Sequence, residues 1–219
     1  MLDIQKDLVE QVTVVSINPN DPVHVENIPP GWHLVGKGNY AAVFGHNALL
    51  PGKIVKVYAI NRGSAADEAE VYKKLASHKS YSELYSSGER HLVLKKLEGV
   101  TLYDALRKGI YIPKQVIKDV DEAIQYASSI GLNPIDIHGK NVIMRDGSGY
   151  IVDVSDFCLT HKCPRWKDFK KAYFLLYYPL FKKFKFSIPH WMLEKGRKGY
   201  QLYLRLSGKG KRKKEKLSG

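Results

Sequence analysis

The sequence predicts a mixed α+β protein in which strands dominate the first hundred residues and helices dominate the rest. Alternating apolar residues mark strand segments at 32–43, 53–60 and 92–98. Apolar stripes at helical spacing mark helices at 65–77, 113–130, 166–185 and 191–206. The 219 residues suffice for one domain, or for two closely joined lobes with a sizeable core.

The net charge of +13 is the unusual feature of the composition. It predicts attraction to polyanions such as nucleic acid, nucleotides, phosphorylated proteins or an anionic membrane surface. Two cysteines argue against a disulfide-stapled secreted domain, and the N-terminus has no charged-then-apolar leader. The longest apolar run, 173–181, is too short to span a bilayer. We therefore expect a soluble cytoplasmic protein without a transmembrane segment.

Residues 32–43 read as a strand, a glycine-bearing turn and a second strand. Gly36 and Gly38 permit unusual backbone torsions and a close approach, so the turn's amides could lie over phosphate oxygens. The alternative interpretation is an ordinary hairpin turn. Residues 1–31 before it predict a strand or short helix and an irregular connection, and their pattern indicates no function.

The strand at 53–60 places Lys56 among apolar residues, which predicts a partner for its ammonium group. The helix that follows, capped by Ser64, carries Glu68 on the same face as its apolar stripe. We expect Glu68 to pair with Lys56. Glu70 is the second choice, because a glutamate in a charged helix is usually solvated.

The segment 128–157 carries the densest set of polar groups. Asp136 precedes Asn141 by five residues in a predicted loop, and Asp153 follows on the second strand of a predicted β-hairpin. This arrangement suits phosphoryl transfer, since one carboxylate can accept a hydroxyl proton while an amide and a second carboxylate hold Mg²⁺. The alternative is that Asp136 and Asn141 cap a turn and Asp153 ends a strand.

These motifs resemble the protein-kinase-like superfamily over residues 32–157. The run Asp-Ile-His-Gly-Lys-Asn at 136–141 resembles its catalytic loop, and Asp-Val-Ser at 153–155 resembles its metal-binding triplet. Two positions depart from the pattern: Pro134 stands where many protein kinases have His, and His138 stands where Ser/Thr-specific members have Lys.

The resemblance implies a nucleotide site in the first half of the chain. Lys56, oriented by Glu68, would bind the α- and β-phosphates of ATP. Ala41 replaces the third glycine of the glycine-rich pattern. The remaining groups implied for adenine are the side chains of Val43 and Leu94, and the hinge backbones of Lys95 and Leu97.

The resemblance also implies a bilobal protein-kinase-like fold, with an antiparallel-sheet N-lobe plus one helix and a reduced, mainly helical C-lobe. The expected divisions are an N-terminal extension (1–31), an N-lobe with hinge (32–97), a C-lobe (98–206) and a basic disordered tail (207–219).

The implied activity is ATP- and Mg²⁺-dependent transfer to a hydroxyl, as in small bacterial serine/threonine protein kinase-like proteins. Asp136 would deprotonate the acceptor, and Asn141 and Asp153 would hold Mg²⁺. His138 would contact the transferred phosphoryl group or brace the loop. Two alternatives stay open: a small-molecule kinase, which His138 favours, and a nucleotide-binding pseudokinase or adaptor.

Three C-terminal features have competing interpretations. Cys158, His161 and Cys163 form either an incomplete zinc site or ordinary loop positions. The helix at 166–185 is expected to face the core with a basic outer side, the alternative being a membrane-surface helix. The tail at 207–219, with six Lys or Arg, would bind nucleic acid or an acidic partner, or would only add solubility.

Overall fold

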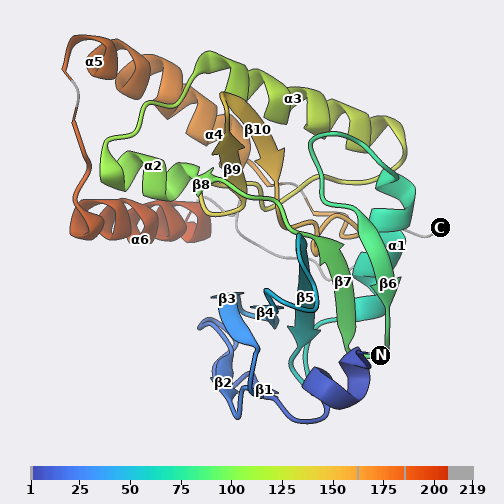
Figure 1. Ribbon diagram of the computed structural model, residues 1–219. Coiled ribbons are helices and arrows are strands. Elements are labelled where there is room, and N and C mark those ends of the chain that lie inside the picture. Colours follow the sequence, from blue (N-terminus) through green and yellow to red (C-terminus); the bar gives the residue numbers. More distant parts are fainter. Residues whose placement is uncertain (1, 162, 185, 207–219) are drawn as a thin grey trace. The chain divides into compact units, whose positions relative to one another are not determined.

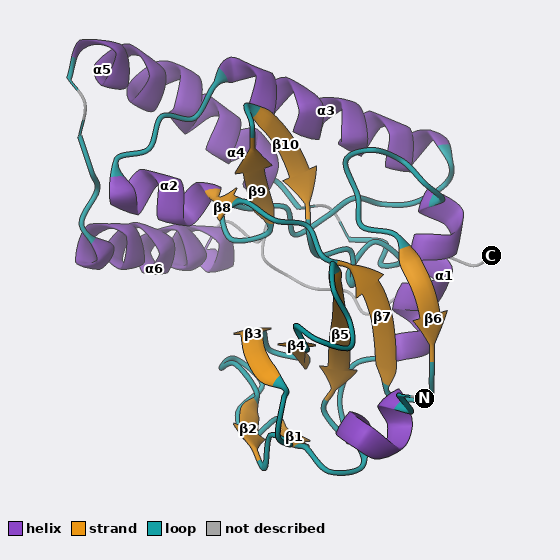
Figure 2. Cartoon of the chain, viewed as in Figure 1, coloured by secondary structure: helices purple, strands orange, loops and turns teal. Residues whose placement is uncertain are grey.

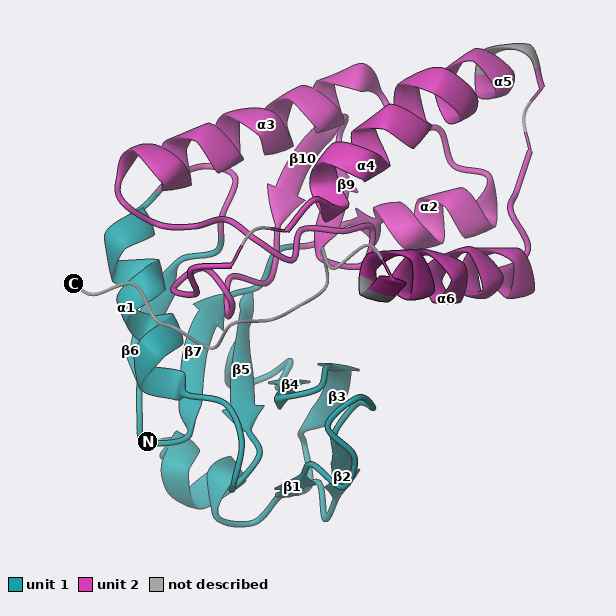
Figure 3. Cartoon of the chain, turned by 180° about the vertical axis from the view of Figure 1, so that it is seen from behind, with its two compact units in different colours: residues 1–77, 82–97 teal, residues 78–81, 98–219 magenta. Residues whose placement is uncertain are grey.

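A computed structural model describes residues 2–161, 163–184 and 186–206 of the chain (Figure 1). The chain forms two compact units, coloured separately in Figure 3. Unit 1 comprises Met1–Ser77 and Ser82–Leu97, and unit 2 comprises His78–Tyr81 and Glu98–Gly219. The predicted mixed α+β class, with an antiparallel sheet that precedes the helices, is confirmed (Figure 2). The predicted basic tail lies outside the described residues.

Unit 1 is built on a five-stranded antiparallel sheet with the strand order β3-β4-β5-β7-β6. Its strands are β3 (His33–Lys37), β4 (Ala41–Gly45), β5 (Lys53–Tyr58), β6 (Leu84–Ser87) and β7 (His91–Lys95). Helix α1 (Ala65–Leu75) contacts β6 and β7. It begins at Ser64, whose side chain accepts a hydrogen bond from the backbone N–H of Asp67 and so satisfies one helix-terminal donor.

The first thirty residues complete the core of unit 1. They form a π-helical turn η1 (Gln5–Val9) and an antiparallel pair, β1 (Thr13–Val15) with β2 (His24–Glu26). Leu8 and Val14 are fully buried and cluster with Phe44, Val55 and Val57 of the large sheet. This segment therefore covers one face of the sheet with apolar side chains, which stabilises the fold through burial.

Unit 2 combines helices with a three-stranded antiparallel sheet in the order β10-β9-β8. The strands are β8 (Val100–Thr101), β9 (Val142–Arg145) and β10 (Ser148–Ile151), and the helices are α2 (Leu102–Lys108), α3 (Lys114–Ser129), α4 (Arg165–Ala172), α5 (Tyr178–Lys183) and α6 (His190–Leu206). The apolar face of α3 packs on β10. Tyr81 belongs to this unit because it is buried there and its hydroxyl donates to the Ala123 carbonyl at 2.8 Å.

The aromatic stretch predicted as one helix consists of α4, a π-helical turn η2 (Tyr173–Tyr177) and α5. Pro179 is the second residue of α5, directly after the π-turn, where its missing N–H is best tolerated. Tyr173, Tyr177 and Phe181 are buried as expected. The outer side differs from the expected basic face, since it also exposes Phe174, Leu175, Leu176 and Leu180. Among the described residues, no helix is both long and apolar enough to traverse a bilayer.

Candidate functional site

Three of the predicted nucleotide-site residues lie in one row across the sheet of unit 1. Gly36 of β3 is opposite Val43 of β4, and Val43 is opposite Lys56 of β5. Leu94 of β7 is opposite Ile54, which is two residues from Lys56 and so faces the same way. The opposite face holds the apolar core. The strand register thus gathers the glycine turn, the apolar side chains and the lysine on one side.

Lys56 is held by Glu68 of α1. Its Nζ lies 2.8 Å from each carboxylate oxygen, and the side chains are only 12% and 1% exposed. The Tyr58 hydroxyl, which sequence reasoning did not single out, also donates to this carboxylate. Glu70, the second choice, instead pairs with Lys73 on the exposed side of α1. The buried Glu68 carboxylate therefore accepts three hydrogen bonds, two from Lys56 and one from Tyr58.

Gly36 and Gly38, at the turn between β3 and β4, have no close neighbours that would exclude a side chain. Neither Gly36 nor Gly38 has a left-handed φ, so the unusual torsions expected of them are not used. A Cβ atom at Gly36 would meet no atom within 4 Å, and one at Gly38 would meet only the Ala41 carbonyl oxygen at 4.0 Å. The fold itself does not require glycine here. What the glycines provide is an uncovered backbone that another molecule can approach closely.

The backbone of Lys95, one of the two expected hinge residues, forms hydrogen bonds within unit 1. Its backbone N–H donates to the Glu83 carbonyl at 2.9 Å, and its carbonyl accepts from the Ser82 hydroxyl at 2.7 Å. Both backbone groups are thus engaged within unit 1. The next backbone N–H, of Lys96, donates to the Gly52 carbonyl. The Lys95 carbonyl oxygen has a second lone pair, so the backbones of Lys95 and Leu97 both stay predicted hinge contacts.

The catalytic-loop candidates form a second set, in unit 2. Asp136 has a left-handed backbone (φ +58°), a conformation that aspartate tolerates better than most residues. Its carbonyl oxygen accepts a hydrogen bond from the Asn141 side-chain nitrogen at 3.1 Å. The Asn141 carbonyl in turn accepts from the Val152 N–H at 3.0 Å. These bonds place Asp136, Asn141 and the residue before Asp153 in one connected loop.

Asp153 follows β10 by two residues and accepts the Ser155 N–H at 3.2 Å, which forms a local turn. Burial lowers the pKa of His138, and the nearby Asp153 carboxylate opposes this by attracting the proton. Nδ1 of His138 lies 3.2 Å from the Lys140 N–H, in hydrogen-bond range.

The described residues contain no group of three or more His, Cys, Asp or Glu side chains that could hold a metal ion. Cys158 and Cys163 are thiols. This finding gives no support to the zinc alternative. It leaves the predicted Mg²⁺ pair untouched, since that pair consists of one amide and one carboxylate.

A comparison with known proteins shows the family of the chain. No protein-family model matches the chain. Over 167 residues, however, it is 38% identical to a protein of Bacillus subtilis (strain 168) named "Putative serine/threonine-protein kinase YrzF", and the match covers 74% of this chain and 75% of the relative. The chain belongs to this family of small bacterial kinase-like proteins. The relationship implies a kinase-like fold.

One contact of Asp136 was not indicated by any sequence pattern. Arg165, the first residue of α4, donates from Nη1 to the carboxylate of Asp136. Both side chains are about one quarter exposed, at 24% and 23%. The two residues are 29 positions apart, so only the folded chain reveals the pair.

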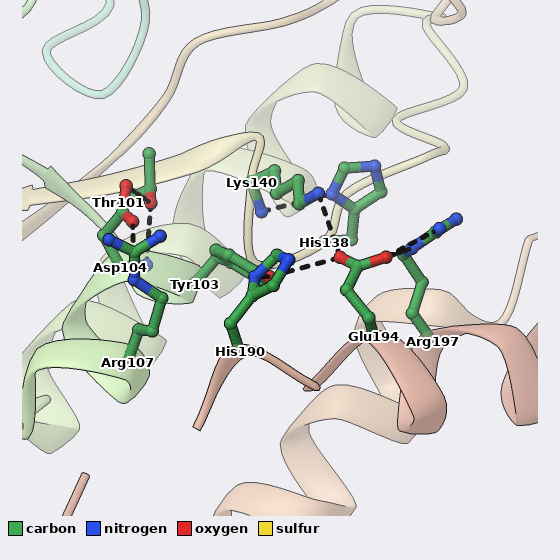
Figure 4. A network of polar contacts seen from close by, with 9 residues as sticks. All are labelled: Thr101, Tyr103, Asp104, Arg107, His138, Lys140, His190, Glu194 and Arg197. Carbon is green, nitrogen blue, oxygen red and sulfur yellow. Dashed lines mark hydrogen bonds and ion pairs between the residues drawn. The ribbon is translucent and has the colours of Figure 1, made fainter. Parts of the chain in front are cut away.

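A second cluster joins the kinase-like loop to the last helix (Figure 4). Glu194 of α6 lies 3.5 Å from Nζ of Lys140, accepts from Arg197 at 2.7 Å and from the Tyr103 hydroxyl at 3.1 Å. The hydrogen bond from Arg197, followed by Lys140 and Tyr103, lowers the pKa of Glu194 to about 2 in spite of burial. The same tyrosine lies 2.7 Å from Nδ1 of His190. Helix α6 is thereby tied to the loop that carries His138.

Proposed function

We propose that the protein is an ATP- and Mg²⁺-dependent phosphotransferase of the serine/threonine protein-kinase type, which transfers the γ-phosphate of ATP to a hydroxyl group. The buried pair of Lys56 and Glu68 carries the proposal. A buried ion pair is seldom more stabilising than an apolar pair of the same size, so stability does not account for it. A fixed ammonium group does suit the phosphates of ATP. The relationship to the Bacillus subtilis protein supports the same reaction class.

In this proposal unit 1 binds the nucleotide. The uncovered backbone at Gly36 and Gly38 approaches the phosphates, and Lys56 neutralises them as a point charge. Val43 is half-buried on the same sheet face and offers an apolar surface to adenine. The backbones of Lys95 and Leu97 supply the hinge hydrogen bonds. Most of the rate then comes from positioning and from charge already in place.

Unit 2 supplies the acceptor chemistry. Asp136 orients the incoming hydroxyl and accepts its proton. The metal-ligand candidates fit Mg²⁺ in their chemistry, because the Asn141 nitrogen is used within the loop, which leaves its amide oxygen as a hard donor, and Asp153 supplies a carboxylate. Bound Mg²⁺ would neutralise phosphate charge. His138 either contacts the transferred phosphoryl group or braces the loop, where its Nδ1 lies in hydrogen-bond range of the Lys140 N–H.

The test is incubation with Mg²⁺ and γ-labelled ATP, with and without generic protein substrates. The variants are Asp136→Asn, Asp153→Asn and the control Asp146→Asn. Asparagine is chosen because Asp136 and Asp146 both have left-handed backbones that asparagine tolerates. We expect label on protein with the wild type and the control, and none with the two site variants.

Other outcomes would decide against the proposal in defined ways. Transfer only to an added small hydroxyl compound would assign a small-molecule kinase, the alternative that His138 favours. ATP binding without transfer to any acceptor would assign a nucleotide-binding adaptor. Label that persists in Asp136→Asn and Asp153→Asn would refute the roles given to these residues.

A further inference from the structure

We infer that Arg165 is a positioning residue, which holds the carboxylate of Asp136 in place for the acceptor hydroxyl. The inference rests on the proposed function, because it deepens the role given there to Asp136. It starts from the contact of Arg165 Nη1 with Asp136 Oδ1. A charge-assisted hydrogen bond of this kind fixes orientation more strongly than a neutral one.

The backbone of Asp136 shows why it needs holding. Few non-glycine residues adopt the left-handed conformation of Asp136, although aspartate tolerates it better than most. Asp136 is constrained from both ends: the Asn141 side chain binds its carbonyl oxygen, and Arg165 binds its carboxylate. Such constraint of one strained residue is typical of functional positions. The tie to Arg165 acts directly on the carboxylate, which is the reacting group.

Arg165 itself starts from a rigid platform. The next residue, Trp166, is buried, and its ring N–H donates to Asp121 of α3 at 2.7 Å. Lys170, one turn later, binds the same carboxylate at 2.9 Å. Two bonds from α4 to α3 thus fix the first turn of α4, and with it the start of the arginine side chain.

The segment before α4 is tied down as well. The Asn133 side chain donates to the carbonyls of Leu159 at 2.6 Å and His161 at 3.0 Å, and its backbone N–H donates to that of Phe157. None of these contacts involves a phosphate group. The inference therefore includes positioning of Asp136 by Arg165 that does not depend on phosphorylation of this segment.

The test compares Arg165→Gln and Arg165→Lys with wild type in the full chain, with Arg145→Gln as control, since Arg145 lies at the β9–β10 turn, where it pairs with the exposed Asp146 and lies over the Tyr150 ring. We expect kcat to fall by about 10- to 100-fold in Arg165→Gln, as for a misplaced catalytic group. The KM for ATP should stay within about twofold, because the nucleotide groups belong to unit 1. Lysine should restore part of kcat. Phosphatase treatment of the wild type should leave kcat unchanged.

Three results would overturn the inference: an unchanged kcat in Arg165→Gln, a raised kcat, which would make the pair autoinhibitory, or a loss of wild-type activity after phosphatase treatment. A stability cycle of Arg165→Gln, Asp136→Asn and the double variant separates this inference from the proposed function. Non-additive shifts in the urea midpoint support the pair even if no acceptor is phosphorylated. Additive shifts refute it even if transfer is observed.

Discussion

Replacing Glu68 by alanine should destabilise the protein by about 3–5 kcal/mol, because Lys56 would stay buried without its anionic partner. The geometry sets this magnitude. Glu68 is 1% exposed and Lys56 is 12% exposed, so water can replace the lost carboxylate only poorly. The Tyr58 hydroxyl would lose its acceptor in the same step. An unsatisfied buried hydroxyl costs about 1–3 kcal/mol, and this loss is part of the total.

The double variant Lys56→Met with Glu68→Leu should behave differently. It removes both charges together and leaves apolar side chains of similar volume. Such replacements of a buried ion pair are often neutral or stabilising. We therefore expect its free energy of unfolding to lie within about 2 kcal/mol of the wild type, the remaining cost being that of the Tyr58 hydroxyl. Phosphoryl transfer should nevertheless be lost.

Urea unfolding followed by circular dichroism measures these free energies for the wild type, Glu68→Ala, the double variant and its two components, Lys56→Met and Glu68→Leu. Glu70→Ala is the matched control, since Glu70 is in the same helix but forms an exposed pair with Lys73. It should cost less than about 1 kcal/mol. The reasoning fails if Glu68→Ala is no more destabilising than Glu70→Ala, or if the double variant loses the sum of the two single losses.

Three further perturbations concern unit 2. Because the pKa of Glu194 is lowered to about 2 from 4.5, its contacts stabilise the fold fully above pH 4.5 and lose this effect as the pH falls toward 2. On acidification the wild type should therefore lose about 1–2 kcal/mol more of its free energy of unfolding than Glu194→Gln does. Identical stability curves of the two proteins at acid pH would contradict this. Asp119→Ala should cost about 2 kcal/mol in urea, because Asp119 is buried and accepts the Gly149 N–H at 2.8 Å. Gly149→Ala should lower the melting temperature, since a Cβ there would lie 2.6 Å from the Val116 carbonyl oxygen, and an unchanged value would disprove the clash.

Elements with a strong repeating pattern were predictable from the sequence. The alternation of β5 predicted Lys56 on one face and Val55 and Val57 on the other, and the two valines lie in the core. The apolar stripe of α3 placed that helix within one residue of its observed bounds. In both cases burial of one face decides the structure, so the local pattern contains the information.

Short or polar elements were not predictable in this way. Strand β6 has mostly exposed residues and β8 has only two, so neither carries a usable alternation. The packing of residues 1–31 into the unit 1 core depends on contacts with strands far along the chain. The π-turn before Pro179 is a local adjustment that helical spacing alone cannot show.

The candidate site divides along the same line. Asp136 and Asn141 could be predicted to lie in one loop because they are only five residues apart in the sequence. The Lys56 and Glu68 pair could be inferred from strand and helix faces. The partners Arg165 and Glu194 could not, since each meets the catalytic loop only through tertiary structure and carries no periodic signal of its own.

Two of the ion pairs described above, one in each unit, differ in exposure. The pair of Lys56 and Glu68 is nearly sealed from solvent, whereas Lys140 of the loop is 49% exposed beside Glu194. Salt screens exposed charges far more than buried ones. In a chain of net charge +13, a sealed pair keeps one ammonium in a fixed position at any ionic strength, which favours exact placement of a triphosphate. The pair of Lys140 and Glu194 is more exposed, and salt therefore weakens it more.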